Sequence, residues 1–153
     1  MICRYVEKPG ERVRLQEAEI VDARTIGHEM LAARDPTVRR RGAEVLRYVG
    51  NDASIEPLLI AIRDADRQVQ VSAANALAVV GDESCAKPLT AVFLKSADDD
   101  VRKATMNAVG VVGSEATRKN LLGLERKFGN SGRAEYIRQA IDAIDSRAKN
   151  PAN

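Results

Sequence analysis

Few side chains in this sequence have the type and spacing that catalysis or metal binding would need. The chain of 153 residues contains one histidine, His28, and two cysteines, Cys3 and Cys85. A zinc or redox site needs closely spaced thiols, such as a CxxC pair, and these two cysteines are far apart. No second histidine exists to act as a base for Cys85, which fits a small packed residue better than a nucleophile. We expect no catalytic residue, no metal and no cofactor.

Acidic and glycine motifs also have structural explanations. The run Asp98-Asp99-Asp100 could hold a cation, but three acids at a helix N-terminus also complement the helix dipole, and we favour this capping role. The glycines are spaced as helix ends and do not form a phosphate-binding loop.

The composition argues against several broad classes. The 24 Lys and Arg residues nearly balance the 22 Asp and Glu residues, so the net charge of +2 does not by itself indicate nucleic acid or an anionic membrane as a partner. No apolar run approaches the ~18–20 residues of a membrane span. Arg4 follows the first three residues at once, which is unlike a secretory signal. Two cysteines make no disulfide framework, so we expect a cytoplasmic protein.

An internal repeat sets the elements that must position any site. Three segments align without gaps, with starts 31 and 32 residues apart: DPTVRRRGAEVLRYVG (35–50), DRQVQVSAANALAVVG (66–81) and DDDVRKATMNAVGVVG (98–113). A second set of motifs recurs with the same period: Pro57-Leu58, Pro88-Leu89 and Asn120-Leu121. Apolar residues recur at helical spacing in both sets, so each repeat predicts two helices.

Capping residues indicate where the helices begin and end. The Asp that starts each aligned segment fits an N-cap, and Pro36 fits the first helical position. Gly50, Gly81 and Gly113 fit left-handed residues that end a helix. The partner helices are expected at residues 54–63, 84–95 and 114–127, and further helices at 16–34 and 133–147.

We expect a single repeat domain at residues 16–148, with an N-terminal arm at 1–15 and a C-terminal tail at 149–153. Its four repeats would cover about residues 16–50, 51–81, 82–113 and 114–148. Pro9-Gly10 interrupts the arm. In the first helix, Val21, Met30 and Leu31 are available for a core face.

This pattern resembles the HEAT-like repeat family, specifically the short-repeat kind first described in phycobilisome (bilin) lyases. The signature of that family runs roughly D-P-x-V-R-x-x-A-x-x-A-L-x-x-x-G, followed by a helix that carries P-L. The first segment matches it at Asp35, Pro36, Val38, Arg39, Ala43, Leu46 and Gly50. The resemblance implies an all-α fold, a right-handed α-α superhelix of about eight helices in four pairs, with the V-R helices on its concave side. The family spans lyases, hydroxylases, reductase appendages and scaffolds, so the resemblance is specific for fold and weak for function.

One enzymatic branch of the family is disfavoured by the residues themselves. Iron-dependent hydroxylases of this family carry several His-Glu pairs directly after V-R. The corresponding pairs here are Arg40-Arg41, Val71-Ser72, Lys103-Ala104 and Glu135-Tyr136. His28-Glu29 lies in the other class of helix, so we interpret His28 as a structural or surface residue.

The resemblance and the register together predict a concave surface for a partner. Its expected residues are Arg40, Arg41, Glu44, Arg47, Tyr48, Val71, Ser72, Asn75, Val79, Lys103, Asn107, Val111, Glu135 and Gln139. This surface runs from basic, through small and apolar, to acidic near Asp142. The valines in its middle are suited to a docked helix or peptide. The alternative is that neighbouring helices cover these valines.

We therefore predict a non-catalytic adaptor that binds a protein or peptide through its concave groove. Nucleic acid is disfavoured as a partner because the basic character of Arg39, Arg40 and Arg41 fades after one repeat. Two alternatives stay open. The chain could be one subunit of a bilin-lyase-like or other enzyme complex, with chemistry shared with a partner chain, or it could form a homodimer through the apolar patch.

Overall fold

The computed structural model describes residues 5–8, 11–14 and 17–149. Its α-helices are α1 (Glu17–Leu31), α2 (Pro36–Val49), α3 (Ile55–Ala61), α4 (Arg67–Val80), α5 (Ala86–Lys95), α6 (Asp99–Val112), α7 (Glu115–Phe128) and α8 (Gly132–Lys149). Single turns of 3-10 helix, Asp52–Ser54 and Glu83–Cys85, lead into α3 and α5. The predicted helices are thus confirmed, with bounds that shift by a few residues.

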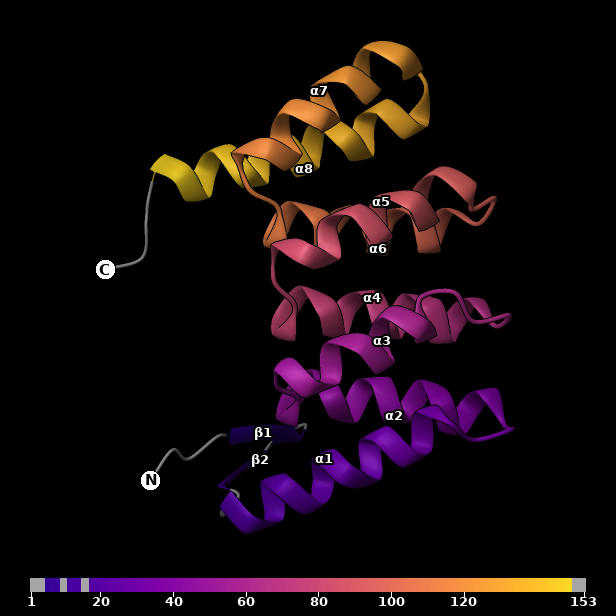
Figure 1. Cartoon of the computed structure of the whole chain (residues 1–153), viewed down its shortest axis with the longest axis vertical. Helices are drawn as coiled ribbons and strands as arrows, with labels where there is room; N and C mark the ends of the chain where they lie inside the picture. Colours follow the sequence, from indigo (N-terminus) through magenta and orange to yellow (C-terminus); the bar gives the residue numbers. More distant parts are fainter. Residues whose placement is uncertain (1–4, 9–10, 15–16, 150–153) are drawn as a thin grey trace.

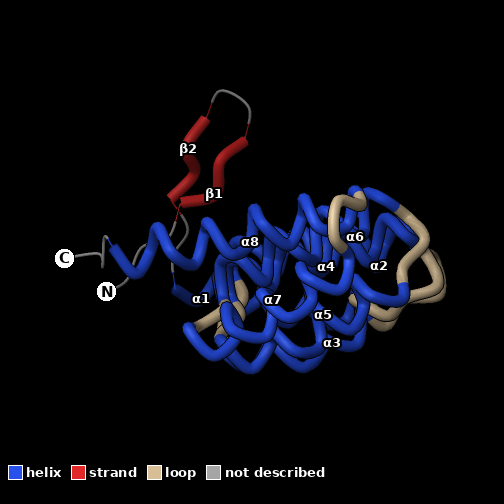
Figure 2. Tube along the Cα trace, turned by 90° about the horizontal axis from the view of Figure 1, so that it is seen from above, coloured by secondary structure: helices blue, strands red, loops and turns tan. Residues whose placement is uncertain are grey.

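The helices stack in the order of the chain, from α1 at one end to α8 at the other (Figure 1). Each odd-numbered helix packs on the even-numbered helix that follows it, which makes four pairs. Viewed along the stack, the even-numbered helices form one layer and α3, α5 and α7 form the other (Figure 2). The expected all-α solenoid of eight helices in four pairs is confirmed for residues 17–149.

A small β-hairpin lies outside the helical stack (Figure 2). Strands β1 (Tyr5–Lys8) and β2 (Glu11–Arg14) pair antiparallel, with Val6 opposite Val13. The expected arm at residues 1–15 thus contains two strands that the helical pattern did not predict. Residues 1–4, 9–10, 15–16 and 150–153, which include Cys3, Pro9-Gly10 and most of the expected tail, lie outside the described residues.

The predicted N-caps are confirmed. The side chain of Asp35 accepts a hydrogen bond from the amide of Thr37, with Pro36 at the first helical position. Asp66 and Asp98 cap α4 and α6 in the same way. Each carboxylate therefore satisfies one or two amides that would otherwise lack a partner at the start of an even-numbered helix.

The prediction that Gly50, Gly81 and Gly113 are left-handed is wrong. Their φ angles are −63°, −78° and −68°, which any residue can adopt. Glycine is required there for space, because a Cβ atom at Gly50 would overlap the carbonyl oxygen of Leu46 and lie 3.0 Å from Val80 Cγ1. Among the described residues, only Gly129 has a positive φ, at 58°.

Small residues allow the even-numbered helices to approach one another closely. Ala43, Ala73, Ala76 and Ala108 are fully buried, and α2 packs on α4, α4 on α6, and α6 on α8. The odd-numbered helices contact one another far less. In the first helix Leu31 packs against the core as expected, whereas Val21 is exposed and the neighbouring Ile20 is buried in its place.

Within the part of the chain that the structure describes, none of the helices combines the length and the apolar character needed to span a membrane.

Candidate functional site

A row of apolar side chains crosses the layer of even-numbered helices. Tyr48, Val79 and Val111 are the penultimate residues of α2, α4 and α6, and their exposed fractions are 44%, 59% and 47%. The corresponding position in α8 is Ala143, which is half-buried. We call Tyr48, Val79 and Val111 the apolar row. Its members lie at one register because the repeat places one residue per helix at the same point of the stack.

A second row, one helical turn nearer the helix N-termini, is polar. It consists of Glu44, Asn75, Asn107 and Gln139, and all four side chains are exposed. The amide of Gln139 donates to Glu135 Oε1 at 3.2 Å. The amides of Asn75 and Asn107 make no hydrogen bond with any residue from 17 to 149. We call this the amide row, because two adjacent helices present unpaired amide groups along it.

Opposite charges mark the two ends of these rows. Arg47 on α2 and Asp142 on α8 occupy the same repeat position, with Ala78 and Gly110 between them on α4 and α6. The guanidinium group of Arg47 lies 5.7 Å from the centre of the Tyr48 ring. Neither Arg47 nor Asp142 forms an ion pair within residues 17–149. The face is therefore basic over α2 and acidic over α8.

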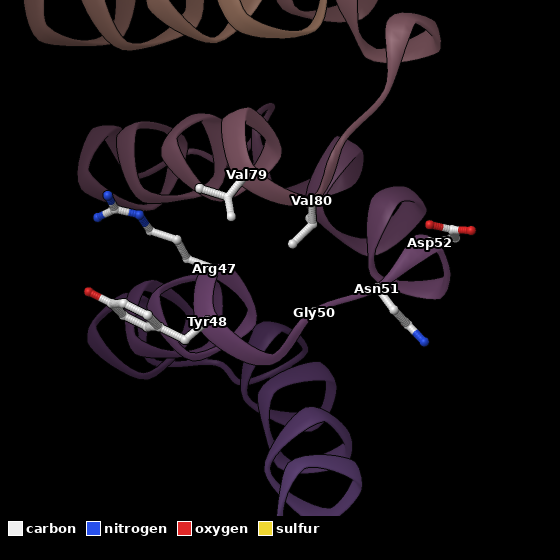
Figure 3. Close-up of a pocket in the computed structure, with 7 residues that line it drawn as sticks. All are labelled: Arg47, Tyr48, Gly50, Asn51, Asp52, Val79 and Val80. Atoms are coloured by element: carbon white, nitrogen blue, oxygen red, sulfur yellow. The ribbon is translucent and has the colours of Figure 1, made fainter. Parts of the chain in front are cut away.

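An open pocket of about 560 Å³ lies at the basic end of the apolar row. It is bounded by the C-terminal ends of α2 and α4 (Figure 3). Val79 and Val80 approach it from α4, and Arg47 and Tyr48 approach it from α2, whereas the side chains of Asn51 and Asp52 point away (Figure 3). The pocket is thus lined by both apolar and polar groups, with the guanidinium group of Arg47 among them.

The family model of HEAT repeats matches residues 26–110, which is more than half of the chain. The protein belongs to the HEAT repeat family. HEAT repeats generally mediate protein–protein interaction, and HEAT repeat proteins are typically non-enzymatic scaffolds. No curated protein matches the chain.

The HEAT register places most of the predicted partner-binding residues on this face, but with unequal exposure. Arg41, Lys103 and Glu135 are exposed, as are the members of the two rows. Arg40, Val71 and Ser72 are half-buried: Val71 packs against the core, and Arg40 Nε lies 3.6 Å from Glu44 Oε1. Ala104 and Gly110, which occupy the positions on α6 equivalent to Arg41 and Arg47 on α2, are buried in the contacts between helices. The sequence analysis predicted each member of the amide row as a surface residue but did not recognise that they form a row. Aligning the four even-numbered helices by repeat position would have shown it.

The side chains of this HEAT repeat protein whose types could support catalysis or metal binding have structural roles. His28 Nε2 lies 2.9 Å from Ser54 Oγ, joining α1 to the turn before α3. Cys85 is a fully buried free thiol, and burial raises its pKa. The amide of Val101 donates to the carboxylate of Asp98 and helps to lower its pKa. Residues 17–149 contain no group of three or more His, Cys, Asp or Glu side chains suited to a metal ion.

Proposed function

We propose that this HEAT repeat protein is a non-catalytic adaptor that binds a partner protein or peptide on its layer of even-numbered helices. The apolar row is the observation that carries the proposal. Exposed helix positions usually hold polar residues, and contiguous exposed apolar side chains mark interaction sites. The other large exposed apolar residues, such as Val21 and Ile60, do not recur at one register on three neighbouring helices.

The packing of the two layers also supports the layer of even-numbered helices as the binding surface. The even-numbered helices contact one another from α2 to α8, whereas the odd-numbered helices scarcely touch. A stack whose helices are closer together on one side curves toward that side, so the even-numbered layer is the inner one. Repeat proteins use such inner surfaces for binding because one partner can contact several repeats at once.

Binding is tested by placing a charge in the apolar row. Val79→Glu introduces a carboxylate at an exposed position, so the fold should be retained, while docking of an apolar partner should be lost. Ile60→Glu is the matched control, because Ile60 is 64% exposed but lies on α3 in the other layer. Partners captured from a cell extract by each variant are quantified by mass spectrometry, and folding is followed by circular dichroism and thermal melting.

The expected result is a partner retained by the unchanged protein and by Ile60→Glu but lost with Val79→Glu. Equal capture by all three proteins would place the binding surface elsewhere. Unfolding of Val79→Glu would show that this valine contributes to the core, and Val111→Glu then repeats the test on α6. Light scattering of the unchanged protein and of Val79→Glu over a range of concentrations shows whether the chain self-associates and whether that association needs this face.

A further inference from the structure

We infer, on the basis of the proposed function, that the partner lies on this face as an extended segment in the polyproline II conformation. It crosses α2, α4, α6 and α8, with its acidic end over α2 and its basic end over α8. The apolar row receives every third side chain of the segment, and the amide row binds its backbone carbonyl groups. The spacing of the rows, the unpaired amides and the order of charges each support a part of this assignment.

The spacing of the helices selects the conformation of the segment. Packed helices lie about 8–10 Å apart, and small contact residues bring them to the lower part of that range. The contacts here are small: a Cβ atom at Gly110 of α6 would lie only 3.2 Å from the Cα atom of Ala140 of α8. Members of the apolar row are therefore expected to recur about every 8–9 Å.

Three regular conformations can be compared with this spacing. A polyproline II segment returns a side chain to the same face after three residues and ~9.3 Å. A β-strand does so after two residues and ~6.7 Å. An α-helix does so after three or four residues and ~5.4 Å, and again after seven residues and ~10.5 Å. The polyproline II segment fits the row best, and a segment of about ten residues reaches from α2 to α8.

The amide row favours the same conformation for an independent reason. The side chains of Asn75 and Asn107 each offer two N–H donors and one carbonyl acceptor. A polyproline II segment has no internal backbone hydrogen bonds, so its carbonyl groups are available to these amides. A helix has already paired its backbone groups, and laying it over Asn75 and Asn107 would remove water from the amides without replacing those hydrogen bonds.

The charges give the segment its polarity. Arg47 lies beside Tyr48 at one end of the apolar row, and Asp142 lies beside Ala143 at the other. Arg41, also on α2, is exposed and has no ion-pair partner within residues 17–149. A carboxylate on the segment over α2 and a Lys or Arg over α8 would pair with these groups, whereas the opposite order would place like charges together.

Designed peptides test the inference directly. The probes are Asp-Leu-Pro-Pro-Leu-Pro-Pro-Leu-Pro-Lys and the same composition with Asp and Lys exchanged, because the direction of the chain is not set by the charges. The comparison peptides carry Asp at both ends, carry Lys at both ends, or are proline-free helix formers with Leu seven residues apart. Binding is followed through the ¹⁵N-labelled side-chain amides of Asn75 and Asn107 in NMR spectra of the full chain.

One of the two mixed-charge proline peptides should shift both amide signals and bind at least tenfold more tightly than the helical or like-charged peptides. Asn75→Asp removes the N–H donors and should weaken this binding about tenfold, whereas Asn120→Asp on α7 makes the same change in the other layer and should not.

Tighter binding of the helical peptide, or unchanged binding by Asn75→Asp, would overturn the inference. Self-association in light scattering that Val79→Glu abolishes would also overturn it. If no proline peptide binds while Val79→Glu still loses a captured partner, the extended conformation is wrong and the proposed function stands. If Val79→Glu loses nothing, the proposed function itself fails.

Discussion

The guanidinium group of Arg39 on α2 binds both carboxylate oxygens of Asp64, which lies just before α4 in the next repeat. Nε donates to Oδ2 at 2.6 Å and Nη2 donates to Oδ1 at 2.8 Å. Nη1 also donates to the carbonyl oxygens of Ala33 and Arg34, in the loop between α1 and α2. One side chain therefore joins two successive repeats and the loop that precedes its own helix. Arg39 is the arginine that matches the V-R signature of the repeat.

Removing this arginine should destabilise the stack. In Arg39→Ala we expect the free energy of unfolding to fall by about 2 kcal/mol, because Asp64 stays mostly buried without its partner. The side chains of Arg39 and Asp64 are only 19% and 11% exposed. The matched control is Arg67→Ala, since the ion pair of Arg67 with Asp98 also joins two repeats but its arginine is well exposed. Urea denaturation should show a loss below about 1 kcal/mol for this control. Equal losses would refute the role of burial.

The same pair should make stability depend on pH. The hydrogen bonds from Arg39 hold the pKa of Asp64 below its ordinary value. The unfolded chain therefore takes up a proton, near pH ~3.9, before the folded protein does, and stability falls as the pH drops through that range. The stability difference between the unchanged protein and Asp64→Asn should be largest above pH ~5 and shrink toward pH 3. In an Arg39→Ala background the same comparison should depend less on pH, because backbone amides such as that of Asp66 are then the main donors to the carboxylate. An unchanged slope there would assign the lowered pKa to those amides and not to Arg39.

Two glycines should respond oppositely to alanine. Gly50→Ala should lower the free energy of unfolding by about 2 kcal/mol or more, because its Cβ atom would overlap the carbonyl oxygen of Leu46. Gly123 lies within α7, and a Cβ atom there would meet nothing within 4 Å. Gly123→Ala should therefore raise the free energy of unfolding by about 0.5–1 kcal/mol, from helix propensity alone. Thermal melts of the two variants give the comparison, and a stable Gly50→Ala would show that the end of α2 can rearrange.

The thiol of Cys85 should be unreactive in the folded protein. It is fully buried, and burial raises its pKa, so very little thiolate is available near neutral pH. In a Cys3→Ser background, modification by a thiol reagent should be at least ~100-fold slower than in urea-unfolded protein, because it requires an opening of the structure. Asn130→Cys, in the exposed turn before α8, provides a fast-reacting control when combined with Cys85→Ala. Fast reaction of Cys85 would show that the turn before α5 opens readily.

Local signals predicted most of the helices, because each signal depends on nearby residues. Asp35, Asp66 and Asp98 each cap a helix that begins at the next residue, as expected from side-chain chemistry alone. The hairpin was not predicted, because four-residue strands carry little periodicity beside a strong helical repeat. The wrong prediction that Gly50 is left-handed has a similar origin. A residue at a helix end fits a left-handed cap in sequence, and only the packed neighbours of Gly50 show that the constraint is the volume of a Cβ atom.

The repeat in the sequence determined by itself that this protein is a helical stack. It also determined which side of each even-numbered helix points away from the core. Only the tertiary structure decided which of the residues on that side are exposed enough to contact a partner. Val79 and Val111 are exposed, whereas Val71 packs partly into the core. The physical reason is that helical periodicity gives the direction of a side chain, whereas its exposure depends on how closely the next helix approaches. That approach is set by contacts such as Gly110 against Ala140, between residues about one repeat apart. The apolar and amide rows exist only once those distances align the four helices.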